Sequence, residues 1–364
     1  MRLTLVISSL GAGGAERVLS LLANHWASRG WSITILTLGK SADSFYTLAP
    51  SITITPLNIA GDSLGIAPKI ANNIKRIRTL RRAIKGLSPQ AVISFMDVTN
   101  ILVMAAAAGL GIPVTAADHC SPRHHSPGAV WNALKPFAYR RASKVVLLSE
   151  SVKQWYPAGV AANSVVIPNP VMPPLDEEGS APQLPKPLVM AMGRFTSQKG
   201  FDLLLKAFAQ ASSAHPEWSL VILGDGPDKN KVKDIAAWLG IAGKVSMPGN
   251  VKNPYAHLKQ ADIFVLSSRY EGFPMSLCEA MACGVACVSF DCDSGPADII
   301  RNGVDGILVP DGDVNGLADA MRNLMGDKSL RERIAVRAPE VTERFGLERV
   351  SAMWDGLLNQ LVSK

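Results

Sequence analysis

The chain has 364 residues and is 48% hydrophobic, which is enough for two domains with substantial cores. Its net charge of +7 is uneven: residues 1–173 carry 17 Lys/Arg and 6 Asp/Glu, or +11, and the remainder carries 20 and 24, or −4. A basic amino-terminal half suits an anionic membrane, a phosphorylated acceptor or nucleic acid. Nucleic-acid binding is disfavoured, because that half lacks interleaved aromatic residues and any recognisable module.

Two simple features bear on location. The longest apolar run, 101–112, has 12 residues with two glycines, which is too short to span a bilayer. The apolar residues 1–10 run directly into a Gly-rich turn, so we expect a first buried strand and not a secretory signal. The five cysteines form no Cys-x-x-Cys pair and are interpreted as small buried side chains in a reducing cytoplasm.

Short apolar strands alternate with helical patterns along the chain. In the first half the pattern predicts strands over 3–8, 32–38, 91–95, 114–117 and 144–148, with helices over 15–28, 70–85 and from 100 onward. In the second half it predicts strands over 188–192, 219–223, 245–247, 263–266, 286–290 and 307–309, and a last amphipathic helix over 347–361. This alternation is typical of doubly wound, parallel α/β domains.

A proline-rich segment separates the two halves. Residues 168–187 hold seven prolines and no periodic apolar pattern, as expected of a linker or long edge loop. We therefore predict an amino-terminal domain over 1–170, a linker over 171–187, a carboxy-terminal domain over 188–345, and a final helix over 346–364.

The most informative motif is a pair of glutamates eight positions apart, Glu271 and Glu279. The first follows the strand predicted at 263–266, and the second lies on a helix predicted over 275–283. In an open α/β sheet, ligands bind beyond the carboxyl ends of the strands. Carboxylates there accept hydrogen bonds from sugar or ribose hydroxyls but repel phosphates, so a nucleotide-sugar site also needs cations nearby.

Two loops can supply that positive charge. Gly13 and Gly14 lie in a Gly-rich turn before the first helix, whose amino terminus can present free N–H groups to an anion. Arg194 and Lys199 follow the first strand of the second half and can bind phosphate. The alternatives are an ordinary Gly-rich turn and two solvated surface charges.

His119 ends a predicted strand and can donate to a sugar hydroxyl or a phosphate oxygen, although a lone histidine is more often structural. His124 and His125 lie nearby, but no cysteine or carboxylate pattern supports a metal site. Two Asp-x-Asp strings, at 291–293 and 311–313, are interpreted as loop residues because protein cations already serve the phosphates.

A strongly basic helix is predicted around 70–85. Its six cations are Lys75, Arg76, Arg78, Arg81, Arg82 and Lys85. Isoleucines recur at helical spacing on the remaining face. Such a helix can rest on anionic lipid headgroups or bind an acceptor pyrophosphate. The alternative is a solvated helix face.

Together these motifs resemble the retaining glycosyltransferases of family 4, which have the two-domain GT-B fold. The resemblance covers essentially the whole chain, and it implies that the final helix, 346–364, crosses back to the amino-terminal domain. It rests on SLGAGGAERV (9–18), GRFTSQKG (193–200), ILGDGP (222–227), the Glu-x7-Glu run at 261–289, GPADII (295–300) and NGVDGILV (302–309). The segments ISFMDVTN (93–100) and DCDSGPADII (291–300) look most like bacterial α-N-acetylgalactosaminyl- and hexosaminyltransferases that act on undecaprenyl-diphosphate-linked sugars.

The resemblance implies a role for each matching residue. Gly13 and Gly14 would meet the donor diphosphate, which Arg194 and Lys199 would neutralise. Glu279 would bind the ribose, and Glu271 would contact the donor hexose. His119 would hydrogen-bond the transferred sugar or phosphate. Backbone groups of Phe273, Pro274, Met275 and Ser276 would also lie by the diphosphate. Where many members have a Glu after a Gly-Gly pair, this chain departs from the pattern and has Asp298 after Ser294-Gly295-Pro296.

The activity implied is metal-independent transfer of a hexose, with retention, from a UDP-sugar to a lipid-diphosphate-linked sugar. No cofactor is expected beyond the nucleotide-sugar substrate. The expected location is cytoplasmic and peripheral, on the inner face of the cell membrane. A nucleotide-sugar epimerase or hydrolase of the same architecture remains the alternative.

Overall fold

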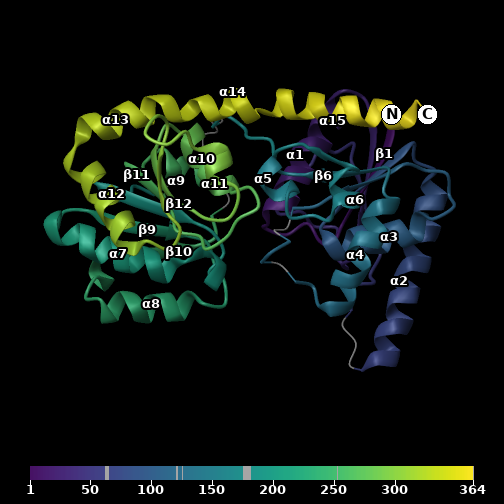
Figure 1. The fold of residues 1–364 in the computed structure, drawn as a ribbon, viewed down its shortest axis with the longest axis horizontal. Helices are drawn as coiled ribbons and strands as arrows, with labels where there is room; N and C mark the ends of the chain where they lie inside the picture. Colours follow the sequence, from purple (N-terminus) through teal and green to yellow (C-terminus); the bar gives the residue numbers. More distant parts are fainter. Residues whose placement is uncertain (62–64, 120–121, 125, 175–181, 252, 364) are drawn as a thin grey trace. The chain divides into compact units, whose positions relative to one another are not determined.

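The computed structural model describes residues 1–61, 65–119, 122–124, 126–174, 182–251 and 253–363. The chain forms two compact units (Figure 1). Unit 1 comprises Met1–Pro170 with Leu347–Lys364, and unit 2 comprises Val171–Gly346. Unit 1 is therefore built from two separate stretches of chain, whereas unit 2 is continuous.

Unit 1 is organised around a parallel seven-stranded sheet of order β3-β2-β1-β4-β5-β6-β7. Its strands are β1 (Arg2–Ile7), β2 (Ser32–Thr37), β3 (Thr53–Pro56), β4 (Ala91–Phe95), β5 (Val114–Ala117), β6 (Lys144–Leu147) and β7 (Ser164–Val166). Its helices are α1 (Gly14–Ser28), α2 (Ile66–Leu87), α3 (Asp97–Ala107), α4 (Ala129–Arg141), α5 (Glu150–Lys153), α6 (Ala158–Ala161) and α15 (Leu347–Val362).

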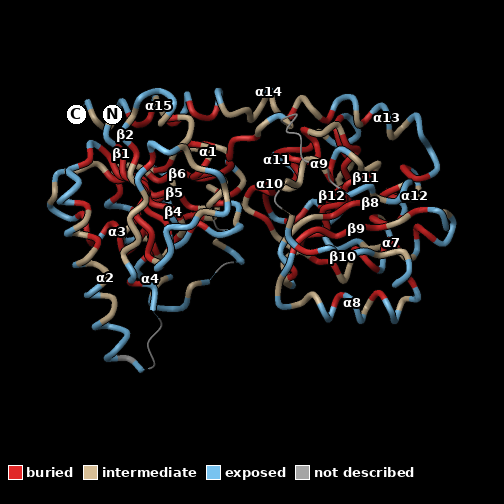
Figure 2. The backbone as a smooth tube through the Cα atoms, turned by 180° about the vertical axis from the view of Figure 1, so that it is seen from behind, coloured by how far each residue is buried: buried red, intermediate tan, exposed pale blue. Residues whose placement is uncertain are grey.

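The central strands of unit 1 are apolar on both faces because helices cover both. β4 is buried along its whole length, as parallel strands between two helical layers must be. On one face, α3 packs against both α2 and α4, and Leu80, Leu102 and Tyr139 from these three helices share a core with the sheet. Figure 2 shows the buried strands at the centre of the unit and exposed stretches along α2.

Helix α15 completes unit 1 although it follows all of unit 2 in the chain. Its Trp354 packs edge-to-face against the fully buried Trp26 of α1, with ring centroids 6.4 Å apart. Trp26 also donates from its indole nitrogen to Asp355 at 2.9 Å, and Arg29 forms an ion pair with the same carboxylate. The expected last helix is present and extends to Val362.

Unit 2 has a parallel six-stranded sheet of order β10-β9-β8-β11-β12-β13. Its strands are β8 (Leu188–Met192), β9 (Ser219–Leu223), β10 (Val245–Gly249), β11 (Ile263–Leu266), β12 (Ala286–Asp291) and β13 (Ile307–Pro310). Its α-helices are α7 (Phe201–Ala214), α8 (Lys229–Trp238), α9 (Pro254–Leu258), α10 (Met275–Ala282), α11 (Pro296–Ile299), α12 (Val314–Gly326), α13 (Lys328–Arg337) and α14 (Val341–Phe345). Short 3₁₀ turns lie at Ser197–Lys199, Ala242–Lys244 and Ala338–Glu340.

Two parallel, doubly wound α/β units confirm the predicted fold class. Part of the proline-rich segment, 175–181, lies outside the described residues, as do His125 and Lys364. The described residues that flank the gap contact unit 2: the Leu184 N–H donates to Gln260 at 3.0 Å, and Lys186 lies 3.6 Å from Asp262. Among the described helices, none is both long and apolar enough to cross a membrane.

Candidate active site

Each sheet has a point where the chain reverses its direction of winding. In unit 2, β9 and β10 lie on one side of β8, whereas β11, β12 and β13 lie on the other. In unit 1 the reversal falls between β1 and β4. Ligands of open α/β sheets bind outside the carboxyl ends of strands at such points. The loops after β8 and β11 carry the predicted residues of unit 2, and the loop after β1 carries Gly13 and Gly14.

Lys199 and Glu271 meet at the reversal point of unit 2. The Lys199 ammonium group donates to Glu271 Oε1 at 2.6 Å, and the Ser268 hydroxyl donates to the same oxygen at 2.6 Å. Glu271 is only 5% exposed, so these two donors replace much of the water that would otherwise solvate its carboxylate. Arg194, in the same loop as Lys199, is exposed. The structure thus joins two residues that the sequence had assigned to separate parts of a ligand.

The two loops are held together by contacts that the sequence interpretation missed. Arg269 makes a bidentate ion pair with Asp202 of α7, at 2.9 and 2.7 Å, and its backbone N–H donates to the Gln198 carbonyl at 2.8 Å. Gly200 has φ of +60°, and a Cβ there would lie 2.0 Å from the Ser267 carbonyl oxygen. Only glycine permits this approach. The loop contacts therefore fix where Lys199 can reach.

Glu279 lies on α10, which begins at Met275 directly after Phe273 and Pro274. Its side chain is buried, with 3% exposure. Phe273 packs edge-to-face on Phe345 at 5.3 Å between ring centroids and so anchors the start of α10. Ser276 is half-buried in the first turn. A second serine, Ser294, donates from its hydroxyl to the Glu271 carbonyl. The contacts of Ser268 and Ser294 with Glu271 were not predicted from the sequence.

In unit 1, the Gly-rich turn leads into α1 as expected, but a carboxylate lies at the helix start. Gly13 is the N-cap of α1 and Gly14 its first residue. A Cβ on Gly13 would lie 2.1 Å from Oε2 of Glu16, so the Glu16 side chain reaches back over the turn. A carboxylate is favourable at a helix amino terminus. An anionic ligand at this turn would therefore meet the Glu16 carboxylate as well as the backbone N–H groups.

His119 follows β5 and lies against Phe95 of β4, with ring centroids 5.4 Å apart. Burial lowers the pKa of His119 to about 4, although the neighbouring Asp118 carboxylate opposes this shift. The imidazole is therefore neutral at physiological pH. It can exchange hydrogen bonds with a hydroxyl or phosphate but does not carry a positive charge.

Asp118 beside it is the centre of a buried polar network. Its Oδ2 accepts from Lys135 at 2.6 Å, Tyr139 at 2.9 Å and Tyr156 at 2.5 Å, and the Asn100 amide donates to the Tyr139 hydroxyl at 3.0 Å. Burial alone would raise the pKa of Asp118, but the Lys135 charge and these hydrogen bonds hold it below its ordinary value. The network ties α4 to the strand end that carries His119.

One aspartate of the two Asp-x-Asp strings has a structural role. Asp313 caps α12, accepting from the Gly316 N–H at 2.9 Å. The thiols of Cys278, Cys283, Cys287 and Cys292 are free, and burial raises the pKa of each. Within the described ranges there is no group of three His, Cys, Asp or Glu side chains that could hold a metal ion.

Two parallel α/β units, with a Lys–Glu pair at the strand ends of the second, match the two-domain GT-B fold expected from the sequence. The model of the glycosyl transferases group 1 matches residues 175–341, and that of glycosyltransferase family 4 matches residues 12–173. The chain belongs to this family of glycosyltransferases.

The chain is also similar to individual proteins over part or all of its length. The chain is 28% identical over 363 residues, covering 99% of both proteins, to the GalNAc-alpha-(1->4)-GalNAc-alpha-(1->3)-diNAcBac-PP-undecaprenol alpha-1,4-N-acetyl-D-galactosaminyltransferase of Campylobacter jejuni. It is 35% identical to the exopolysaccharide phosphotransferase SCO2592 of Streptomyces coelicolor over 60% of this chain but only 24% of that protein. The structure of Anabaena Alr3699/HepE in complex with UDP and glucose superposes with a TM-score of 0.80 at 18% identity, covering 99% of this chain and 100% of that one.

Proposed function

We propose that this glycosyltransferase moves a hexose, in particular an N-acetylhexosamine, from a UDP-sugar to a sugar linked to a lipid diphosphate such as undecaprenyl diphosphate. The product would enter bacterial surface polysaccharide or glycan assembly. The observation that carries the proposal is the paired Lys199 and Glu271 at the reversal point of unit 2. The Campylobacter relative, whose name specifies an undecaprenol-diphosphate acceptor, supports the choice of acceptor.

Different parts of the donor would contact the two carboxylates of unit 2. Lys199 and Arg194 would neutralise the diphosphate, and backbone groups of 273–276 would hydrogen-bond to it. Glu271 would accept from hydroxyls of the hexose, and Glu279 from hydroxyls of the ribose. Because Glu271 already holds the Lys199 ammonium at 2.6 Å, donor binding would require Lys199 to share its hydrogens between this carboxylate and the diphosphate.

The chemistry proposed is a front-side displacement with retention at the anomeric carbon. The leaving phosphate would take the proton of the acceptor hydroxyl, so no protein nucleophile is required. Positioning of the two substrates and charge stabilisation at the diphosphate would supply most of the rate. His119 would hydrogen-bond the transferred sugar or phosphate as a neutral imidazole. We propose that the protein cations make a divalent metal unnecessary.

The acceptor would be reached from the cytoplasmic face of the inner membrane, with α2 near the headgroups. Of the six cations between 75 and 85 on α2, Lys75, Arg78, Arg82 and Lys85 are exposed, and Lys69 nearer the start of the helix is exposed as well. Arg76 instead donates to the Ile59 and Gly61 carbonyls, and Arg81 to the Ala106 and Ala108 carbonyls. Five cations of this helix are therefore exposed and available to an anionic surface.

The test is product analysis with a synthetic lipid-diphosphate disaccharide and a panel of UDP-hexoses and UDP-N-acetylhexosamines. Thermal stabilisation by each donor, which reports binding to the native state, selects the donors to assay. We expect a trisaccharide product with an α linkage by NMR, formed equally well in excess EDTA. Free epimer or free sugar without transfer would instead support the epimerase or hydrolase. Loss of activity in EDTA with recovery on adding Mg²⁺ or Mn²⁺ would contradict metal independence.

A further inference from the structure

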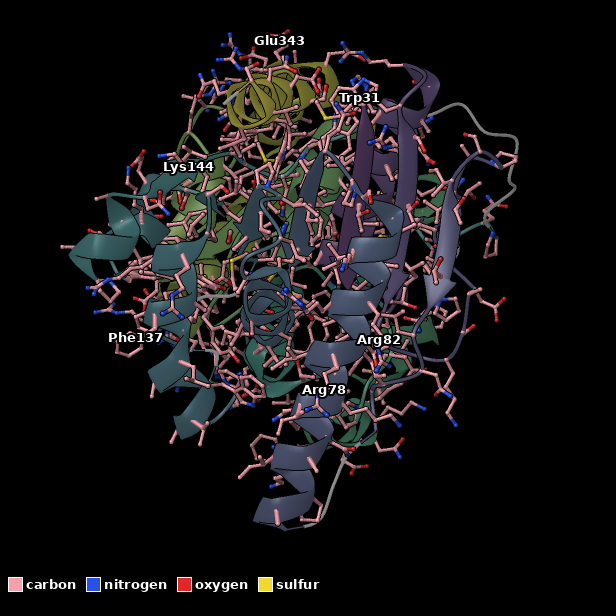
Figure 3. The ribbon with its side chains drawn as sticks, turned by 90° about the vertical axis from the view of Figure 1, so that its right-hand side faces the viewer. Trp31, Arg78, Arg82, Phe137, Lys144 and Glu343 are labelled. Atoms are coloured by element: carbon pink, nitrogen blue, oxygen red, sulfur yellow. The ribbon has the colours of Figure 1, made fainter. Side chains whose placement is uncertain are left out.

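Exposed apolar side chains are concentrated on two helices of unit 1. Of the eleven large hydrophobic residues that are exposed in the described part of the chain, six lie on α2 or α4. On α4 they are Val130, Leu134 and Phe137, with exposures of 70%, 45% and 65%. Their spacing of four and three residues places them on one stripe of the helix. Figure 3 shows Phe137 on the outside of α4, in the same unit as Arg78 and Arg82 of α2.

The charge around this stripe has one sign. Between Asp118 and Glu150 the sequence has five Lys/Arg and no acidic residue, and between Asp62 and Asp97 it has seven and none. On and beside α4, Arg123, Arg140 and Arg141 are exposed. An apolar stripe with cations at its borders is the pattern of helices that lie in the interface of an anionic bilayer.

The opposite side of α4 is anchored, so the stripe cannot turn inward. Lys135 lies 2.6 Å from the fully buried Asp118, and Tyr139 is completely buried while donating to the same carboxylate. Asn100 of α3 in turn bonds the Tyr139 hydroxyl. Buried polar contacts therefore hold α4 in an orientation that leaves three large apolar side chains exposed to water.

We propose that α4 is a membrane-inserting helix whose Val130, Leu134 and Phe137 enter the acyl boundary of an anionic lipid bilayer. Three side chains on one helix are too few for a stable protein interface, which needs roughly 800 Å² from each partner. Three apolar side chains are sufficient to insert into a bilayer to which the surrounding cations are already attracted. The inference extends the peripheral membrane location proposed above. It differs from that proposal by naming α4, and not only the cations of α2, as a membrane contact.

Insertion of α4 has a geometric consequence for the site of unit 1. Lys135 and Tyr139 hold Asp118, and the next residue is His119. A bilayer that fixes the depth of α4 therefore also fixes the distance of His119 from the lipid headgroups. A sugar carried on a lipid diphosphate projects from those headgroups by a defined length, so this depth would select the length of acceptor glycan that can reach His119.

The first test compares two triple variants in vesicle co-sedimentation. One is Val130→Ser, Leu134→Ser, Phe137→Ser on α4, and the matched control is Trp238→Ser, Val304→Ser, Val336→Ser, which removes three exposed apolar side chains of unit 2. Vesicles contain phosphatidylcholine with or without phosphatidylglycerol. At about 0.5 M NaCl, where electrostatic attraction is screened, we expect the α4 variant to lose roughly tenfold or more in partition coefficient and the control to match the parent protein. Equal melting temperatures and UDP binding check the folds.

The second measurement places Phe137 directly. Compared with the parent protein, which has seven tryptophans, Phe137→Trp should show added fluorescence that is quenched by vesicles brominated on their acyl chains and not by vesicles brominated on their headgroups. Vesicle binding by the α4 triple variant equal to the parent would overturn the proposal. A change in the sedimentation coefficient of the α4 triple variant without lipid would also overturn the proposal, because it would show that the stripe joins copies of the chain. Neither readout requires sugar transfer, so Phe137 quenching in a protein inactive on lipid-linked acceptors would reject the proposed function and leave the insertion standing.

Discussion

At the scale of single residues, Lys199 is held by a partner before any ligand arrives. Its ammonium lies against a carboxylate that is 5% exposed, and a serine hydroxyl shares that carboxylate. A lysine held in this way loses little rotamer freedom when it turns to a diphosphate. The proposed site is thus preorganised by Glu271 and not by the donor alone.

Lys199→Ala should lower kcat by roughly a hundredfold or more, about 3 kcal/mol of transition-state stabilisation, because the leaving diphosphate loses a cation. Lys206→Ala, which removes an exposed lysine of α7, is the control. Steady-state kinetics at saturating donor measure the effect. Near-parental turnover of Lys199→Ala would remove Lys199 from the diphosphate site.

Glu279→Gln should weaken binding of free UDP, because a carboxylate that binds ribose contacts the nucleotide and not the transferred sugar. Glu271→Gln should weaken binding of the UDP-sugar more than that of UDP. Isothermal titration of both ligands against both variants gives the ranking. The opposite ranking would mean that the two carboxylates have exchanged roles.

His119 should make the protein less stable in mild acid. Its pKa is about 4 in the folded chain and 6.5 in the unfolded chain, so between these values the unfolded chain binds more protons. The free energy of unfolding should therefore fall as pH decreases from 6.5, by at most about 1.4 kcal/mol per pH unit. Urea unfolding of the parent and of His119→Gln over this range measures the difference. Parallel pH dependences in the two proteins would contradict the shifted pKa.

At the scale of elements, the cations of α2 fall into two groups, those that bond backbone carbonyls and those that are exposed. Arg76 and Arg81 bond backbone carbonyls of their own unit, which explains why they are half-buried and why their loss would disturb the fold. Leu80 and Ile84 are fully buried against α3 and the sheet. The exposed side keeps Arg78 and Arg82, so charge changes there test membrane attraction without touching the core.

Arg78→Glu with Arg82→Glu should release the protein from anionic vesicles at low salt, since each cation contributes on the order of 1 kcal/mol near such a surface. It should also raise KM for a lipid-linked acceptor and leave UDP binding unchanged. Lys231→Glu with Lys233→Glu, an equal charge change on the exposed face of α8, is the control. If both double variants release the protein from anionic vesicles equally, only the net charge matters and α2 has no special role.

At the scale of the whole molecule, the sequence predicted the two α/β halves and most strand positions. β4, β5, β8, β9 and β11 have the expected bounds because four- and five-residue apolar runs between turns are clear signals of buried strands. The edge strands β3 and β7 were missed, because each is short and largely half-buried and so lacks a distinct pattern.

The sequence predicted which residues belong to the candidate site, but it did not predict which of them contact one another. Lys199 and Glu271 are 72 residues apart, and nothing local to either shows that β8 and β11 are neighbours in the sheet. The same reason hid Lys135, which meets Asp118 from a helix that the periodicity did not reveal. Long-range pairs of this kind depend on strand order, which a single sequence does not specify.

The packing of α15 on the rest of unit 1 can be tested through the contact between Trp354 and Trp26. Trp354→Ala should destabilise unit 1 by about 3–5 kcal/mol, because it leaves a cavity beside the buried Trp26. Met353→Ala, at a neighbouring position that is 40% exposed, is the control. Hydrogen exchange should show faster exchange in β1 and β2 with β8 and β9 unchanged. Equal loss of protection in both units would mean that α15 stabilises the whole chain.

The discontinuity of unit 1 also sets an order of events during synthesis. Residues 1–170 emerge first, but the helix that covers Trp26 emerges only after the 176 residues of Val171–Gly346. At about 5–20 residues per second, that interval lasts roughly 10–35 seconds. Throughout it, unit 2 can finish folding while the α1 surface of unit 1 stays uncovered. A chaperone that binds nascent apolar segments would therefore find its longest-lived target on the part of the protein made earliest.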